Sequence, residues 1–237
     1  MKRLVLLFVA IGLISACEES SAERARSIAK LQLERNEYHA KRASYDLGSK
    51  RNAETKIAQI SEELADKYLS DSDFAKASEE FYVSANFYRE IGLIKRALQN
   101  YDNAIQYGEN MRMKWSNETI VESAFEGIAA IYQGTYCDNR DAHKACKSSI
   151  DYEKAKGYLE KVVAFNNKKG CSYYIANYEL ANNYFLGRFK SGKDVSQGVF
   201  YMNQAVSLLN STGMGICKIN WEGKIAEMLK LYRAGTY

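Results

Sequence analysis

The chain has 237 residues, of which 46% are hydrophobic and 26% charged, and its formal net charge is +4 at pH 7. This length suffices for one large domain or one array of repeats with a sizeable core. The near balance of 33 basic and 29 acidic residues gives no signature of nucleic-acid binding, for which a clustered basic surface is expected.

Residues 1–17 read MKRLVLLFVAIGLISAC, in which two cations precede a short apolar run and small residues precede Cys17. This pattern resembles the signal of a bacterial lipoprotein. The resemblance implies that residues 1–16 are a cleaved signal peptide, that Cys17 is acylated, and that the protein is anchored to a membrane of the cell envelope. Because Glu18 rather than Asp follows the cysteine, we expect the outer membrane, facing the periplasm. The alternatives are a cleaved secretory signal and a transmembrane anchor, although the apolar run is well short of the roughly 20 residues that span a bilayer.

Residues 17–50 are expected to hold the lipidated N-terminus, a tether and a polar helix that ends near Asp46 to Lys50, where Gly48 and Ser49 break the helical pattern. His39 lies on this helix and is expected to be solvated. Residues 51–237 are expected to form a helical domain. The chain has no proline, which favours helices because proline costs about 3 kcal/mol in a helix interior. Helices are predicted over 52–69, 73–92 and 93–110, with Ser70 to Asp73 as a stop and an N-cap, and a last helix over 221–235.

Small and large residues recur on these helices at helical spacing. The sets are Ser84, Ala85 and Tyr88 followed by Ala97, Tyr101 and Ala104; Ile128, Ala129 and Tyr132 followed by Ala155, Leu159 and Val162; and Leu180, Ala181 and Tyr184 followed by Gly198, Met202 and Ala205. The first set, with Phe81 and Gly92, resembles the tetratricopeptide repeat, and the third, with Gly187, Gly192 and Tyr201, resembles the Sel1-like repeat. The resemblance implies an all-α fold, an α-solenoid of antiparallel helix pairs. The phase is open, since Leu64, Ala65, Tyr68, Ala77 and Phe81 fit the template one helix earlier; an irregular helical bundle is the alternative.

In tetratricopeptide proteins a ligand groove is formed by the first helix of each repeat. Transferred to this chain, the resemblance implies a partner-binding surface whose side chains face solvent in the free protein. Its residues are Tyr82, Asn86 and Arg89, then Glu126, Ala130 and Gln133, then Tyr178, Asn182 and Phe185. Aromatic rings give rigid contact area, and Asn, Gln and Arg can hydrogen-bond an extended backbone.

Four cysteines remain after Cys17, and an even number in an exported chain favours disulfides because the periplasm is oxidising. Of the three possible pairings we favour Cys137 with Cys146, which closes a short loop, and Cys171 with Cys217, which lie near the starts of two similar helices. A zinc site that uses His143 is the alternative, but its spacing matches no standard pattern.

Catalytic motifs are absent from the sequence: it has two histidines and no phosphate loop, nucleophile elbow or zinc-protease motif. The acidic pairs Glu62-Glu63 and Glu79-Glu80 are interpreted as solvated helix faces. We therefore expect no enzyme, catalytic residue, cofactor or metal, but a periplasmic scaffold that binds a protein partner, in envelope or surface-appendage assembly. The alternatives are a peptidoglycan-binding Sel1-like protein and a self-associating structural lipoprotein.

Overall fold

The computed structural model describes residues 20–42, 47–108, 119–135, 147–165 and 170–209, together with residues 223, 226, 227 and 230. In these ranges the regular structure is helical, and no β-strand occurs. The helices are α2 (Ser21–Arg42), α3 (Leu47–Ser70), α4 (Phe74–Glu90), α5 (Ile94–Tyr107), α6 (Ile120–Gln133), α8 (Tyr152–Ala164), α9 (Cys171–Phe185) and α10 (Val195–Leu209). The all-α prediction is therefore confirmed for the described chain.

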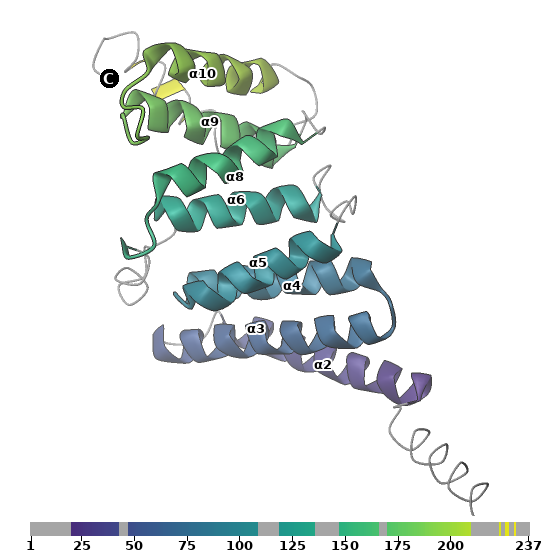
Figure 1. Ribbon diagram of the computed structural model, residues 1–237. Helices are drawn as coiled ribbons and strands as arrows, with labels where there is room; N and C mark the ends of the chain where they lie inside the picture. Colours follow the sequence, from purple (N-terminus) through teal and green to yellow (C-terminus); the bar gives the residue numbers. More distant parts are fainter. Residues whose placement is uncertain are drawn as a thin grey trace, which may run out of the picture.

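The helices are stacked in chain order, from α2 at one end to α10 at the other (Figure 1). Each helix packs against its neighbours in sequence, and in addition α4 contacts α6 and α6 contacts α9. The hydroxyl of Ser78, early in α4, donates a hydrogen bond to the carbonyl of Ala104, late in α5, whereas Asn86, later in α4, accepts one from Tyr101, earlier in α5. These two helices are antiparallel.

Local sequence signals set the helix ends. The side chain of Asp73 accepts a hydrogen bond from the backbone N–H of Lys76, as the predicted N-cap requires. Gly92 follows α4 with a φ of 80°, a left-handed conformation that suits glycine at a helix end. Thr119 and Glu122 form a capping box at the start of α6.

The boundary between α2 and α3 differs from the expectation. Helix α3 already begins at Leu47, so the prediction that residues 46–50 break the helical pattern is wrong over 47–50. Gly48 and Ser49 lie in the first turn of the helix, where their poor helix propensity costs little. The predicted last helix over 221–235 lies outside the described residues except for four positions, and it remains a prediction.

The small-and-large stripes form the core, as predicted. Ala85, Tyr88, Ala97, Tyr101 and Ala104 are fully buried, and the corresponding stripe residues on α6, α8, α9 and α10 are buried as well, apart from Tyr132, which is half-buried. Glycines allow rings to enter this core: a Cβ on Gly127 would lie 2.4 Å from Cζ of Tyr101, and one on Gly198 would lie 2.5 Å from the ring of Phe185. Close packing of this kind fixes the distance between successive helices.

Three arginines of helix α2 form ion pairs with the stack, beside the buried Leu31. Arg24 pairs with Asp71 at 2.6 Å, Arg35 pairs with Glu80, and Arg42 pairs with Glu54 at 2.7 Å and with Glu90 at 3.0 Å. The expectation that Glu79-Glu80 is a solvated face is therefore wrong at Glu80, which is buried. Its carboxylate can be buried because the guanidinium group of Arg35 compensates its charge.

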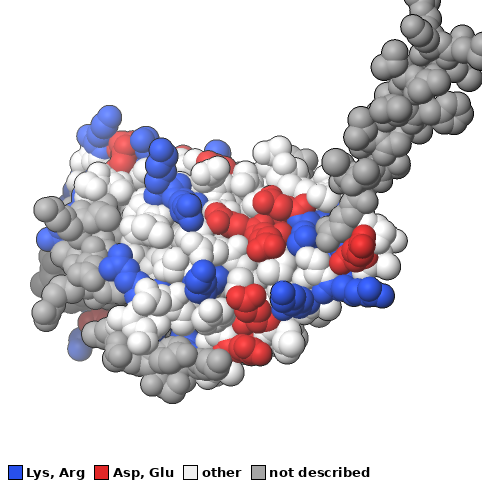
Figure 2. Space-filling view, turned by 90° about the horizontal axis from the view of Figure 1, so that it is seen from below, with Lys and Arg blue, Asp and Glu red and all other residues white. Residues whose placement is uncertain are grey.

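The surface at the α2 end of the stack carries Lys and Arg side chains interspersed with Asp and Glu (Figure 2). His39 lies on α2 and is exposed, as expected, with its ring centroid 5.5 Å from that of Phe87. Desolvation, together with the charges of Arg35 and Arg42, lowers the pKa of His39 below its ordinary value.

Candidate functional site

Three helices, α4, α6 and α9, form a row in which α6 contacts both of the others. Two hydrogen bonds connect α6 to α9: the hydroxyl of Ser172 donates to Glu126 at 2.7 Å, and the amide of Gln133 donates to Glu179 at 3.3 Å. The two pairs lie at the same sequence separation and seven residues apart on each helix. Because both partners advance together, α6 and α9 run parallel.

The predicted partner-binding residues lie on these three helices. Six are half-buried, with part of each side chain reaching solvent; they are Tyr82, Asn86, Arg89, Glu126, Tyr178 and Asn182. Asn86 of α4 accepts a hydrogen bond at its side-chain oxygen from the hydroxyl of Tyr101 of α5, at 2.8 Å. Its amide donates to the carbonyl of Tyr82 at 3.0 Å. Asn86 therefore also holds α4 to α5.

The other predicted positions are buried. Gln133 is 6% exposed and bonds Glu179, and Phe185 is 2% exposed with its ring against Gly198. Ala130 is 5% exposed. The expectation that these three side chains face solvent is therefore wrong. The sequence template gives the helix on which a residue lies, but the ring of Phe185 turns toward α10 because glycine there leaves space for it.

A polar network connects α3, α4 and α5. The hydroxyl of Tyr88 donates to Glu62 at 2.7 Å and accepts from Arg96 at 2.9 Å, while the amide of Asn100 donates to the other Glu62 oxygen at 2.7 Å. Burial, followed by the hydrogen bond to Glu62, raises the pKa of Tyr88 to about 12. The phenol stays protonated near neutral pH and donates, so the network holds three helices together. The expectation that Glu62 belongs to a solvated helix face is therefore wrong, because its carboxylate accepts hydrogen bonds from Tyr88 and Asn100.

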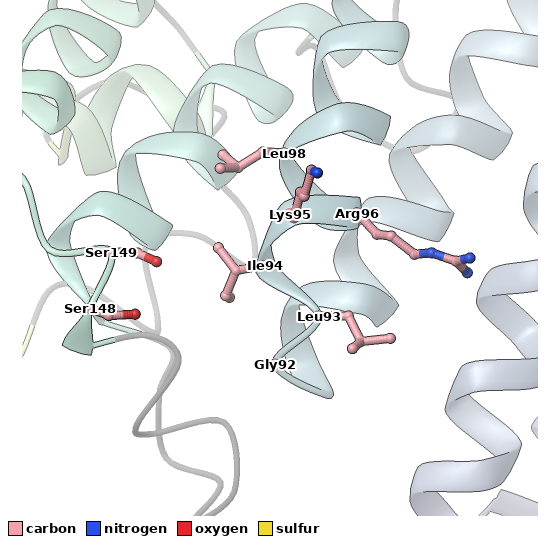
Figure 3. Close-up of a pocket in the computed structure, with 8 residues that line it drawn as sticks. All are labelled: Gly92, Leu93, Ile94, Lys95, Arg96, Leu98, Ser148 and Ser149. Atoms are coloured by element: carbon pink, nitrogen blue, oxygen red, sulfur yellow. The ribbon is translucent and has the colours of Figure 1, made fainter.

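A second surface, which sequence analysis did not identify, lies between the start of α5 and the turn before α8. An open depression of about 690 Å³ is lined here by Gly92, Leu93, Ile94, Lys95, Arg96, Leu98, Ser148 and Ser149. Ile94 points toward the turn that carries the two serines, whereas Arg96 points the opposite way (Figure 3). Apolar surface is accessible next to it, since Ile150 is 41% exposed.

Cations and aromatic rings pair on α6 and α8, the latter being the helix that follows the turn with the two lining serines. Lys154 lies over the ring of Tyr132 at 5.2 Å, and Lys161 lies over Tyr158 at 4.7 Å and over Phe125 at 5.2 Å. The rings of Tyr132 and Tyr158 are stacked, with centroids 6.1 Å apart. Such cation–π contacts hold the lysines above the rings. We call the depression and this cluster together the α5–α8 surface.

Asp102 contributes a negative charge from α5 to this surface. It lies one turn beyond Leu98, and burial raises the pKa of its carboxyl while the nearby Lys161 lowers it. Burial and the neighbouring Asp102 raise the pKa of Tyr158. The spacing of Lys154, Tyr158 and Lys161, four and three residues apart, is the sequence signal that could have indicated this shared helical face.

Cys171 is disulfide-bonded. Cys17, Cys137, Cys146, Cys217 and His143 lie outside the described residues, so the acylation, the two pairings and the zinc alternative remain predictions. Within the ranges that the structure covers, His, Cys, Asp and Glu side chains do not gather in a group of three that could hold a metal ion. None of the helices among the described residues is long and apolar enough to cross a bilayer.

Comparisons with protein family models, with curated proteins and with solved structures give no match for this chain. What the molecule does must therefore be argued from its own surfaces.

Proposed function

We propose that this chain is a lipid-anchored α-solenoid of tetratricopeptide and Sel1-like repeats that serves as a scaffold in the bacterial envelope and has no catalytic activity. The observation that carries the proposal is the row of α4, α6 and α9, in which alternate helices contact each other. Alternate helices meet in this way when helix pairs repeat with α4/α5, α6/α8 and α9/α10 as the units. This favours the phase in which Ala85 and Ala97 belong to one repeat.

The row offers a surface suited to a protein partner. Tyr82 and Tyr178 supply partly exposed rings on its outer helices, and Asn86, Asn182 and Arg89 supply amide and guanidinium groups near them. Aromatic and arginine side chains dominate the binding energy of many interfaces, and amides can bond a peptide backbone. We propose that a protein partner, in envelope or surface-appendage assembly, binds here.

The binding proposal is tested by affinity purification of the tagged protein from solubilised membranes, with Tyr178→Ala and Asn182→Ala compared with the wild type. Loss of an anchoring ring should weaken binding of the co-purified protein by about 2 kcal/mol. Leu33→Ala is the control, because Leu33 is exposed on α2, which is not one of the three helices of the row. Thermal melts check that each variant is folded. Equal recovery of the partner with all variants would refute binding at this row.

Two outcomes of the same preparation would favour other functions. Retention on purified peptidoglycan, with no protein partner, would favour cell-wall binding. A concentration-dependent mass in light scattering, with no other protein present, would favour a self-associating structural protein.

The anchor is tested separately with Cys17→Ser. We expect the wild type in the membrane fraction, because a triacylated cysteine carries enough hydrocarbon for stable anchoring, and the variant in the soluble periplasmic fraction. A variant that stays with the membrane, together with an unacylated wild-type N-terminus in mass spectrometry, would contradict the lipoprotein assignment.

A further inference from the structure

We propose that the α5–α8 surface is a second docking site, and that its occupant is an acidic protein segment in an extended conformation that also carries an apolar side chain. This goes beyond the proposed function, because it uses other helices than the row of α4, α6 and α9 and does not depend on what binds there.

The apolar part of the site is the open depression. Ile94 and Leu98 lie one turn apart on α5 and line it, and the exposed Ile150 directly follows the lining Ser149 in the chain. A leucine or aromatic side chain that enters the depression removes its own apolar area and that of these residues from water, which favours binding. This provides a binding energy that free inorganic anions cannot use.

The charged part of the site is a segregated face of α8. Lys154 and Lys161 lie over rings of α6 and α8, and Lys161 lies near Asp102 of α5. The acids of the same helix are engaged elsewhere: Glu153 accepts a bond from the backbone of Lys190, and Glu160 pairs with Lys156 at 3.9 Å. Lys154 and Lys161 thus share a helical face of α8 with Tyr158.

Among the described residues, the balance of charge is positive around the depression. Lys95 lines it, and the exposed Lys147 precedes the two serines. With Lys154 and Lys161 this makes four lysines, against Asp102 and against Asp151, whose carboxylate is 3.8 Å from the ammonium group of Lys154. A segment with two or more carboxylates complements this surface, whereas a basic segment does not.

The spacing of the lysines favours a polypeptide. Seven helical residues separate Lys154 from Lys161, a rise of about 10 Å along α8. An extended polyproline-II chain brings residues i and i+3 to the same side about 9 Å apart. Acidic residues three apart can therefore reach both lysines. A membrane of anionic lipids fits less well, because Asp102 and the rings lie among the cations and would lose their hydration against a layer of phosphates.

The test uses the full chain in detergent and two fluorescein-labelled peptides. One contains the pattern Leu-x-x-Glu-x-x-Glu with serine and alanine at x, and the other has lysine in place of each glutamate. Fluorescence anisotropy at low ionic strength should show at least tenfold tighter binding of the acidic peptide. The Lys154→Glu/Lys161→Glu double variant should bind it at least tenfold more weakly, and Asp102→Asn should bind it more tightly than the wild type.

The matched control is Lys190→Glu/Lys193→Glu, which reverses two exposed lysines on the turn between α9 and α10 and should change the affinity less than twofold. Both double variants alter exposed side chains, and circular dichroism verifies that they fold. Tyr178→Ala should leave peptide binding unchanged, so failure of this site and failure of the row are distinguishable. Equal binding of the two peptides, or no binding of the acidic peptide, would overturn the proposal. So would displacement of the acidic peptide by dihexanoyl phosphatidylglycerol if the Lys154→Glu/Lys161→Glu variant bound that peptide as tightly as the wild type.

Discussion

Gly127 and Gly157 are both glycines inside helices, yet the structure gives them opposite roles. At Gly127, on α6, a Cβ would lie 2.4 Å from the fully buried ring of Tyr101, whereas at Gly157, on α8, no atom lies within 4 Å of a Cβ. The first glycine is thus needed for packing, and the second only lowers the helix propensity of α8.

Substitution of these two glycines by alanine should therefore change stability in opposite directions. Gly127→Ala should cost about 1 to 3 kcal/mol, because Tyr101 has no space into which it can move. Gly157→Ala should stabilise by roughly 0.5 to 1 kcal/mol. Urea denaturation of both variants measures this, and a Gly127→Ala variant as stable as the wild type would contradict the packing described for Tyr101.

The pair of Arg35 and Glu80 makes stability depend on pH. Burial raises the pKa of Glu80 above its ordinary value of 4.5, and Arg35 opposes this rise. Arg35→Met should raise the pKa of Glu80 further and cost about 2 kcal/mol at pH 7, between the effects of exposed and fully buried pairs. A carboxyl with a raised folded-state pKa is destabilising above that pKa, and this penalty is absent below the unfolded-state value.

The loss of stability in Arg35→Met should therefore shrink as the pH falls from 7 to about 4.5, the ordinary value of the carboxyl. Denaturant titrations at several pH values measure it. Arg35→Met/Glu80→Leu is the control: with both charges removed, the pH dependence of this difference should disappear. A loss that stays constant over this range would show that the carboxylate of Glu80 is not what Arg35 compensates.

At the scale of helices, α2 differs from the others because ion pairs contribute a large share of its docking. Arg24, Arg35 and Arg42 contact α3, α4 and the turn between them, whereas Leu31 is its buried apolar residue. Helices α4 and α5, by contrast, are joined by fully buried alanines and tyrosines. Salt weakens partly exposed charge pairs but strengthens apolar burial or leaves it unchanged.

We therefore expect α2 to open at lower free energy in high salt. Amide hydrogen exchange of α2 should be faster in about 1 M than in about 0.05 M sodium chloride, because the Debye length falls to about 3 Å. The amides of α5 serve as the internal control and should not exchange faster. Equal exchange of α2 at both salt concentrations would mean that apolar contacts alone hold it.

At the scale of the whole molecule, contacts run between helices that are near in sequence, with α6 at the centre of the described stack. A disturbance at α6 should therefore spread to its direct neighbours first. Ala129 is fully buried in the cluster that α6 forms with α8 and α9. Ala129→Leu should overpack this cluster and cost about 1 to 3 kcal/mol.

Hydrogen exchange of the Ala129→Leu variant should increase most in α6, α8 and α9 and least in α2 and α3. Stacks in which each element contacts only near neighbours lose structure locally in this way. The reference variant is Ala97→Leu, in which the largest increase should move to α4 and α5. A uniform increase over all helices in both variants would indicate one cooperative core, as in an irregular bundle.

The sequence by itself determined that the chain is helical and that the small-and-large stripes of its helices are buried. The recurrence of Ala85, Tyr88, Ala97 and Tyr101 at helical spacing predicts which side of α4 and α5 is buried, because a helix turns by a fixed angle per residue and apolar area must leave water. The N-cap at Asp73 was readable for a similar reason, since the bond to Lys76 is local.

Only the tertiary structure decided what lies opposite the polar and half-buried positions. Glu80 is an ordinary surface residue in the sequence, and it is buried because Arg35, forty-five residues earlier, lies across from it. Phe185 turns inward because Gly198 leaves room, and Lys154 and Lys161 meet the rings of α6 only through the packing of α6 on α8. Periodicity along one helix carries no information about such partners, since charge compensation and space depend on residues that come together only in the folded chain.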